Sequence, residues 1–243
     1  MKNTFVKSAM SAFLAALMVC FVAGNVSAQK NEDKKEELKE ARSEAKEAAK
    51  VLSEMMSKPD DFIPRELLEK ASAIAIFPDV VKAAFIVGGR GGDGVVARRT
   101  ATGWSVPVYY NIGGASFGAQ IGAKRTDHIM LFMNEGSLRD LLDEKVEFGG
   151  DLSFAAGPVG RTIGAATNPT LDAGILVWSR SAGAFVGASI KGAVLTADNS
   201  KNKAVYGMSA KEILASPATV KTNGLSKEIT NFSGTVARYA GKK

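Results

Sequence analysis

The chain has 243 residues, 31 of them basic and 25 acidic, so its formal net charge is +6, and it contains one histidine and one cysteine. This mild basic excess permits contact with anionic surfaces. So few histidine and cysteine side chains exclude the usual zinc sites, and neither a calcium-loop nor a phosphate-loop spacing occurs. We therefore expect no metal and no cofactor.

Residues 1–28 have the pattern of a cleaved secretory signal. Two lysines precede an uncharged apolar run from about Ala9 to Ala23, and Val26–Ala28 has small residues at the positions that a signal peptidase reads. The run is short for a membrane span, which needs about 20 apolar residues; an uncleaved anchor is the alternative. Cys20 is expected to leave with the signal, so the mature chain must be stabilised by packing without disulfides.

Residues 29–56 are predicted to form a helix with one apolar side. The stretch is charged, rich in alanine and free of glycine and proline, and apolar residues recur at helical spacing. These residues are Leu38, Ala41, Ala45, Ala48, Leu52 and Met55. A core-facing helix is favoured, because a helix lying on a membrane would have bulkier apolar residues and a more basic polar face. A second, short helix is expected to begin at Pro64, since proline suits the first helical position.

From Ile74 onward, short apolar or alternating runs between glycine-rich turns predict β-strands. The turn at Ser181–Gly183 joins the last two strands as a hairpin. The expected strands are Ala73–Phe77, Ala83–Val87, Val95–Arg99, Trp104–Tyr110, Ser116–Ala123, His128–Met133, Asp151–Ala156, Ile175–Arg180 and Ala184–Gly192. Further helices are predicted at Ser137–Asp143, capped by Ser137, and around Lys211–Ala215 and Ser226–Tyr239.

Glycines share one face of two predicted strands, at Gly118 with Gly122 and at Gly183 with Gly187. Such repetition predicts a strongly coiled sheet or a small barrel, and short links favour antiparallel pairing. We expect an α+β fold, with a strongly coiled, mainly antiparallel, glycine-rich β-sheet or small barrel, an N-terminal helix pair and C-terminal helices. Residues 29–243 should form a single domain.

Two glycine motifs match known signatures, but their surroundings do not fit. Gly89–Gly94 matches G-x-G-x-x-G, yet β-branched residues follow it where a dinucleotide site needs a helix. Gly114–Gly118 matches G-x-S-x-G, yet the residues after Ser116 alternate like a strand. The single histidine, His128, has Asp127 as its neighbour, which is poorly placed to orient the ring from its far side. We expect no enzyme; a hydrolase using Ser116 is the less favoured alternative.

Basic residues beside apolar or glycine-rich turns form the candidate binding site. If these turns gather at one end of the sheet, the side chains form a cationic rim beside turn amides, and both groups suit phosphate. Ordinary solvated charge is the alternative. The candidate lipid-binding residues are Lys82, Arg90, Arg98, Arg99, Lys124, Arg125 and Arg161.

Several short motifs follow one another in order along most of the chain. They are Ala71–Pro78, Lys82–Phe85, Gly88–Gly94, Gly103–Pro107, Ser116–Gly122, Thr126–Asp127, Gly157–Arg161, Ser179–Phe185 and Tyr206–Gly207. Together they resemble the SYLF domain family of lipid-binding proteins, also called the Ysc84 actin-binding type. The resemblance covers residues from about 44 to 217. Eukaryotic members bind phosphoinositides and, in some cases, actin.

The resemblance implies non-catalytic binding of phospholipid, and it transfers no catalytic residue set. With the secretory signal, it implies an exported protein, periplasmic or secreted and peripheral to a membrane, whose ligand is an anionic envelope phospholipid. Neither actin nor nucleic acid is expected as a partner. The alternative is a protein-interaction or structural envelope factor that docks a partner through the N-terminal helix.

Overall fold

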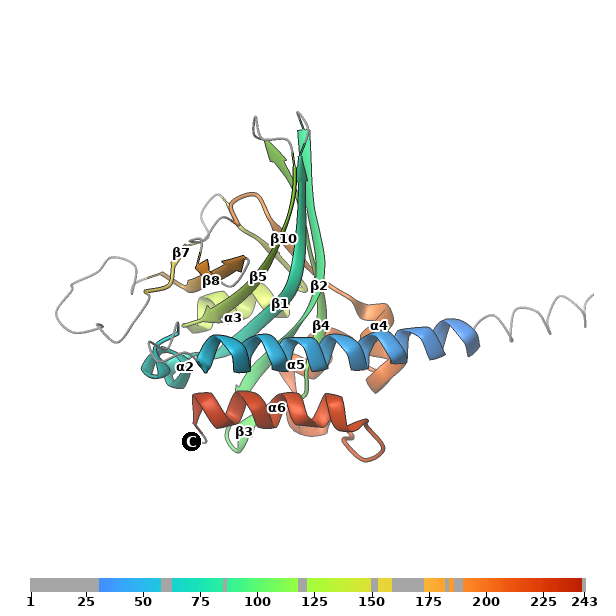
Figure 1. The fold of residues 1–243 in the computed structure, drawn as a ribbon. Helices are drawn as coiled ribbons and strands as arrows, with labels where there is room; N and C mark the ends of the chain where they lie inside the picture. The colour runs from blue at the N-terminus through green and yellow to red at the C-terminus, as the bar shows by residue number, and fades with distance from the viewer. Residues whose placement is uncertain are drawn as a thin grey trace, which may run out of the picture.

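A computed structural model describes residues 31–57, 63–84, 87–117, 122–149, 153–158, 173–181, 184–185 and 190–241. The predicted signal lies outside these residues. The N-terminal helix, residues 31–56, crosses one face of the sheet (Figure 1). Most of the predicted stripe is fully buried, since Ala41, Ala45, Ala48, Leu52 and Met55 are 0% exposed, whereas Leu38 is partly buried. The prediction of a core-facing helix is confirmed.

The described strands form one sheet in the order β6-β10-β4-β2-β1-β5-β8-β7, with β3 beside β2 and β9 beside β8. All neighbours are antiparallel except β7 and β8. The strands are β1 (Ala73–Ala84), β2 (Val87–Thr100), β3 (Gly103–Trp104), β4 (Val108–Phe117), β5 (Gly122–Phe132), β6 (Lys145–Glu147), β7 (Phe154–Ala156), β8 (Ile175–Ser181), β9 (Ala184–Phe185) and β10 (Val194–Ala197).

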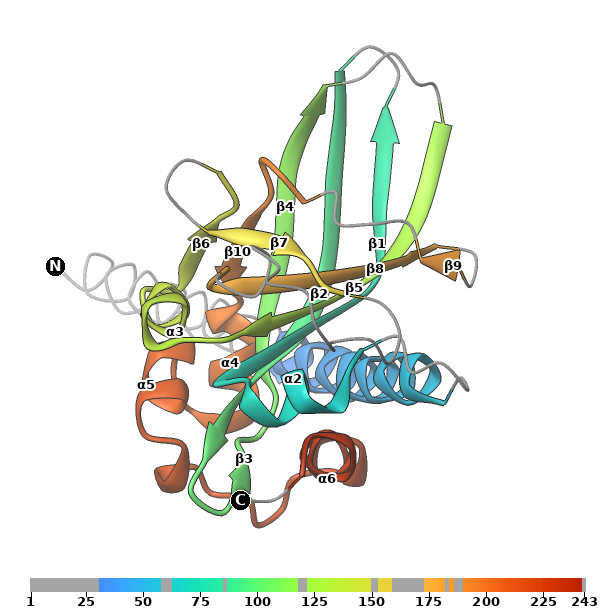
Figure 2. The ribbon, with the colours of Figure 1, turned by 90° about the vertical axis from the view of Figure 1, so that its left-hand side faces the viewer.

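The sheet is strongly curled and open: among the described residues, its two ends, β6 and β7, are not paired with each other. The predicted α+β class and coiled antiparallel sheet are thus confirmed, in the form of a half-barrel. Ends of β1, β2, β4 and β5 extend well beyond the helices (Figure 2). We call this projection the blade. It comprises residues 80–84, 87–92, 113–117 and 122–126.

Three predictions at the glycine-rich stretches are wrong, for the same physical reason. The glycine-rich residues 88–94 form no loop but lie inside β2, paired with β1 on one side and β4 on the other. The predicted strand Ala83–Val87 instead spans the end of β1 and the start of β2, and Ser116–Ala123 likewise spans the end of β4 and the start of β5. Glycine is a common turn residue, but here several glycines lie within strands, and Gly89, for example, pairs with Ala83 and Ala115.

One glycine is required by a close approach. β1 has a bulge between Phe77 and Val80, where Asp79 takes a φ of 49°. Gly94 of β2 lies against it, so that a Cβ on Gly94 would be 2.4 Å from the carbonyl oxygen of Ile76 and 2.5 Å from the Phe77 ring. A side chain at this position cannot be accommodated without moving the bulge.

The remaining helices are α2 (Arg65–Lys70), α3 (Glu135–Leu142), α4 (Asn199–Tyr206), α5 (Ala210–Ala215) and α6 (Lys227–Ala240). Pro64 is the N-cap of α2 and not its first residue. The cap of α3 is Asn134, while Ser137 is the third helical residue of a capping box. The predicted helices near α5 and α6 are confirmed, whereas α4, β6 and β10 were not predicted.

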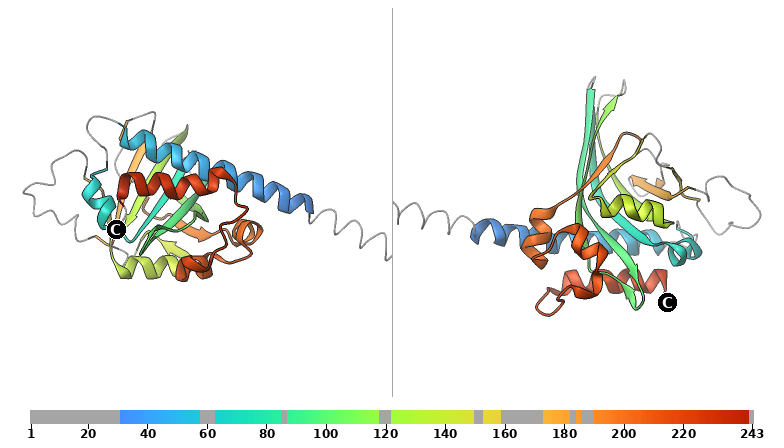
Figure 3. Two further views of the ribbon diagram at one scale, coloured as in Figure 1. Left: turned by 90° about the horizontal axis from the view of Figure 1, so that it is seen from below. Right: turned by 180° about the vertical axis from the view of Figure 1, so that it is seen from behind.

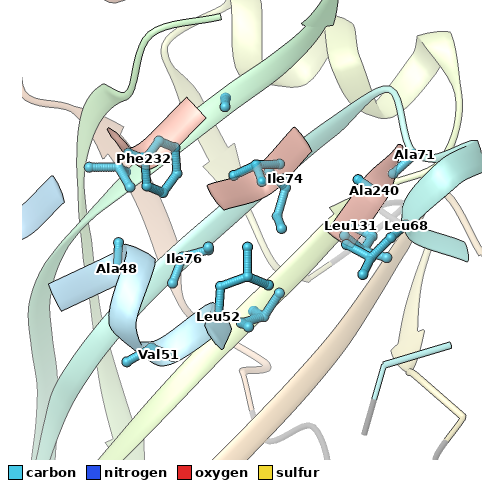
Figure 4. Close-up of a cluster of buried hydrophobic side chains, with 14 of the residues drawn as sticks. Ala48, Val51, Leu52, Leu68, Ala71, Ile74, Ile76, Leu131, Phe232 and Ala240 are labelled. Atoms are coloured by element: carbon cyan, nitrogen blue, oxygen red, sulfur yellow. The ribbon is translucent and has the colours of Figure 1, made fainter. Parts of the chain in front are cut away.

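The hydrophobic core occupies both faces of the sheet. The N-terminal helix and α6 lie side by side on one face (Figure 3), where Leu52 and Phe232 pack with Ile74 and Ile76 of β1 (Figure 4). On the other face, a second cluster joins β4 and β10 to α3 and α5. Alternate residues of β1 therefore enter different clusters, and the blade beyond Val80 extends past both.

Candidate functional site

The structure brings three of the seven predicted cations into one row across neighbouring strands. Lys82 of β1 lies opposite Arg90 of β2 on one side and Lys124 of β5 on the other. Directly paired residues of an antiparallel sheet project from the same face, and adjacent strands are about 4.8 Å apart. These three side chains, which we call the cation row, therefore share one face of the blade.

On this face, the described strands of the blade place no acidic residue beside the cation row. Its neighbours are Val80, Gly92, Gly114 and Thr126. Lys124 is exposed, whereas Lys82 and Arg90 are partly buried. Burial lowers the pKa of Arg90, but a guanidinium stays charged at neutral pH. The row thus places three basic side chains within the width of three strands.

Arg125 is separated from the cation row because it follows Lys124 directly and projects from the opposite face. It pairs with Val81, which is 37% exposed. Its guanidinium Nη1 is 4.0 Å from the Asp79 carboxylate, and both side chains are well exposed. On this opposite face, Ala83 and Ala123 form the next pair beside Val81 and Arg125.

Arg98 and Arg99 lie at the other end of β2, eight and nine residues beyond Arg90 and thus about 26 Å away along the strand. Arg98 donates from Nη1 to the Leu214 carbonyl, 2.7 Å away, at the end of α5. These residues are not brought together with the cation row. The last predicted cation, Arg161, lies outside the described residues.

Arg99 binds the carboxyl ends of two helices. Its Nε donates to Ala71 and its Nη2 to Leu68, at 2.8 and 2.6 Å, and Nη2 also donates to Ala240 of α6 at 3.3 Å. The guanidinium stacks over the Trp104 ring at 4.3 Å. It satisfies helix-end carbonyls and complements the helix dipoles. No local pattern could reveal this role, because the acceptors are as far as 141 residues away in sequence.

The predicted hydrolase elements are not arranged for catalysis in the described structure. His128 is 5% exposed and its Nδ1 bonds to Ser179 Oγ at 2.8 Å. Burial, with a contribution from Arg90, lowers the pKa of His128 to about 4. Asp127 projects from the other face and binds Arg180 at 2.7 Å. The row containing Ser116 crosses β5 at Gly122, six residues and about 20 Å from His128.

Among the described residues, no group of three or more histidine, cysteine, aspartate or glutamate side chains could hold a metal ion. None of the described helices has both the length and the apolar character needed to cross a membrane.

Residues 113–233 match the family model described as "Ysc84: Las17-binding protein actin regulator". The chain belongs to the SYLF domain family. LAS seventeen-binding protein 3 of Saccharomyces cerevisiae is 32% identical over 162 residues, which are 64% of this chain and 35% of that protein. SH3 domain-containing YSC84-like protein 1 of Homo sapiens is 33% identical over 150 residues, which are 61% of this chain and 44% of that protein.

The SYLF chain thus spans between about a third and just under half of the length of these relatives. The matched range begins in β4 and includes Lys124, but it does not include Lys82 and Arg90. Because the family description names an actin regulator, the comparisons lend no support to the expectation that actin is not a partner.

A buried charge cluster that sequence reasoning missed anchors the N-terminal helix of this SYLF protein. Lys201 of α4 is 3% exposed and bonds to Glu44 of that helix, with Asp198 at 3.3 Å and Glu40 at 3.5 Å. Burial raises the pKa of Glu44 to about 7, although Lys201 acts against the shift. The only feature of the sequence that pointed to this cluster was Asp198, the N-cap of α4, three positions before Lys201.

Proposed function

We propose that this protein binds anionic phospholipid surfaces without catalysing a reaction, through the cation row. The observation that supports this most directly is the alignment of Lys82, Arg90 and Lys124 on three neighbouring strands that project beyond the helices. A basic side chain near an anionic membrane surface contributes about 1 kcal/mol. Resemblance to the lipid-binding SYLF proteins supports the same ligand class.

The test is co-sedimentation of the protein with phosphatidylglycerol and with phosphatidylcholine vesicles, at low and moderate salt. We expect binding to the anionic vesicles alone, weakening with salt, since screening acts over about 10 Å at 0.1 M. Lys82→Gln with Lys124→Gln should weaken binding about thirtyfold, because two contacts of about 1 kcal/mol are lost.

The matched control is Lys211→Gln with Lys221→Gln. Both lysines are exposed and lie near α5, away from the blade, and the pair changes the net charge equally. An equal loss in both double variants would contradict a localised site, as would unchanged binding in the Lys82/Lys124 variant. Arg98 and Arg99 are unsuitable for this test, because their removal leaves helix-end carbonyls without donors.

The proposal includes export to the cell envelope, in the periplasm or outside the cell, which rests on the sequence pattern of residues 1–28. The intact mass of the protein isolated from an envelope fraction should correspond to a chain beginning at Gln29. A chain that retains Met1 and fractionates with the cytoplasm would contradict this part of the proposal.

A protein partner is the second candidate function, and the names of the relatives favour it: one is a LAS seventeen-binding protein, and the family description names an actin regulator. The apolar stripe of the N-terminal helix is buried, so a partner would have to contact other surfaces. Co-sedimentation with actin filaments tests this directly. Deleting residues 29–56 would be uninformative, because that helix completes the core.

A further inference from the structure

A cleft of about 490 Å³ lies at the end of the sheet opposite the blade. The end of α2, the link from α2 to β1, the end of β2 and the start of α3 form its walls. Its polar lining comprises Glu69, Lys70, Ser72, Arg98, Arg99 and Glu135, with Thr100. The volume falls within the range of small-molecule sites, about 300–1,000 Å³.

The lining carries charges of both signs. Lys70 and Arg98 supply cations, Glu69 and Glu135 supply carboxylates, and the buried Leu138 adds an apolar surface. A ligand with only one charge could pair with only one of these two sets of side chains. The composition therefore favours a ligand that is itself zwitterionic.

The two arginines of the cleft differ in how many of their hydrogen-bond donors are already used within the protein. Arg99 already donates from Nε and Nη2 to carbonyls of α2 and α6, and these helix ends offset its charge. Arg98 uses only Nη1, for Leu214; within the described part of the chain, its Nε and Nη2 donate no hydrogen bond. Its single bond orients the guanidinium in advance, which lowers the entropic cost of binding a ligand.

We propose that this cleft binds a small ligand with a phosphate and a primary amine, as in phosphoethanolamine. The phosphate contacts Arg98 and Lys70, since guanidinium and ammonium groups are strong donors to phosphate oxygens. The amine contacts Glu69 and Glu135. The ligand is either free or the headgroup of a lipid. This site is about 26 Å along β2 from the cation row. The proposal for the cleft does not depend on the function proposed for the cation row.

The experiment is an NMR titration of the purified protein with O-phosphoethanolamine, and separately with inorganic phosphate and with ethanolamine. We expect phosphoethanolamine to bind at least about tenfold more tightly than either half, because both charge sets are then paired. Lys70→Gln and Glu135→Gln should each weaken binding about five- to tenfold. Both residues are exposed, and a thermal melt verifies that each variant is folded.

Lys211→Gln and Glu147→Gln are the matched controls, and they should leave the affinity unchanged. Equally tight binding of inorganic phosphate or of ethanolamine would overturn the proposal, and so would no shift at millimolar phosphoethanolamine. Phosphatidylethanolamine vesicles distinguish the two sources of the ligand. If the protein binds these vesicles and Lys70→Gln abolishes that binding, the ligand is a lipid headgroup. If the protein binds only free phosphoethanolamine, the ligand is a soluble compound. Lys82→Gln with Lys124→Gln should leave this affinity intact, so the two sites can fail separately.

Discussion

His128 is a single buried base whose titration should be visible in the stability of the whole protein. Burial first, and Arg90 second, lower its pKa from 6.5 to about 4. Because its pKa is lowered, His128 stays neutral in the folded chain, whereas in the unfolded chain it takes up a proton. Stability should therefore fall as pH decreases from 6.5 to 4, by up to about 3 kcal/mol.

Urea unfolding of the protein and of His128→Asn at several pH values between 4.5 and 7.5 measures this contribution. The advantage of the parent over the variant should shrink as the solution is acidified. Glu44 acts in the opposite sense, because its raised pKa makes the folded state lose stability as pH rises toward about 7; only the difference between the two chains isolates His128. Ser179→Ala, which keeps the imidazole, is the control. Parallel curves for parent and His128→Asn would refute the assignment.

Two glycines of β2, three residues apart, should differ in their tolerance of the same substitution. Gly94→Ala places a Cβ 2.4 Å from the Ile76 carbonyl oxygen, and such overpacking should destabilise by about 1–3 kcal/mol or more. Gly91 has no atom within 4 Å of its added Cβ, so Gly91→Ala should change stability by less than about 0.5 kcal/mol. Thermal melts of both variants decide the matter, and equal effects would mean that the bulge does not constrain Gly94.

At the scale of elements, the N-terminal helix depends on the bond between Lys201 and Glu44. Lys201→Met leaves Glu44 as an uncompensated buried carboxylate, and the expected cost is about 3–5 kcal/mol. Adding Glu44→Leu should recover most of that loss, because two apolar side chains then replace the buried pair. The coupling free energy is obtained from urea unfolding of the single and double variants.

The control for this double-mutant cycle is the pair Lys39 and Glu36 on the same helix, whose side chains are 76% and 58% exposed. Replacing it in the same way should give a coupling below about 0.5 kcal/mol. If Lys201→Met cost no more than Lys39→Met, the charge cluster would not anchor the helix.

The elements that the sequence predicts well are those whose signal is local. The apolar stripe from Ala41 to Met55 predicted both a helix and its buried side, because one periodic pattern determines both. Helix α4 was missed because its sequence is mostly polar; only the cap Asp198 and Gly207, with a φ of 72°, mark its ends. Such caps identify a helix only when a neighbouring apolar pattern indicates where to look.

The candidate site was predictable in its residue types but not in its geometry. The three residues of the cation row were identified by their position near turns, yet their alignment depends on the register of β1 with β2 and β5. That register depends on where the hairpin turns, and the glycine-rich stretch suggested a turn several residues too late. The capping role of Arg99 depends on helix ends that meet only in the folded chain.

Across the whole molecule, the blade should be less stable than the helix-covered base of the sheet. Small residues such as Gly91, Ala83 and Ala123 fill it, whereas the same strands bury Ile74, Ile76 and Leu131 at the base. Backbone amides exchange from locally opened states where few apolar contacts resist opening. Hydrogen exchange should therefore be fast in residues 88–92 and 123–125, and limited by global unfolding in residues 74–76 and 129–131.

Hydrogen exchange measured with added phosphatidylglycerol vesicles links this difference in stability between blade and base to the proposed function. Ligand bound to the cation row should slow exchange in the blade, because the strands must release the ligand before they open locally. It should slow the base as well, because binding to the folded state reduces the population of the globally unfolded state. Phosphatidylcholine vesicles provide the control. Uniform exchange along β2 without vesicles would contradict the stability gradient. Protection of the base alone by anionic vesicles would instead place the lipid at the helix-covered end.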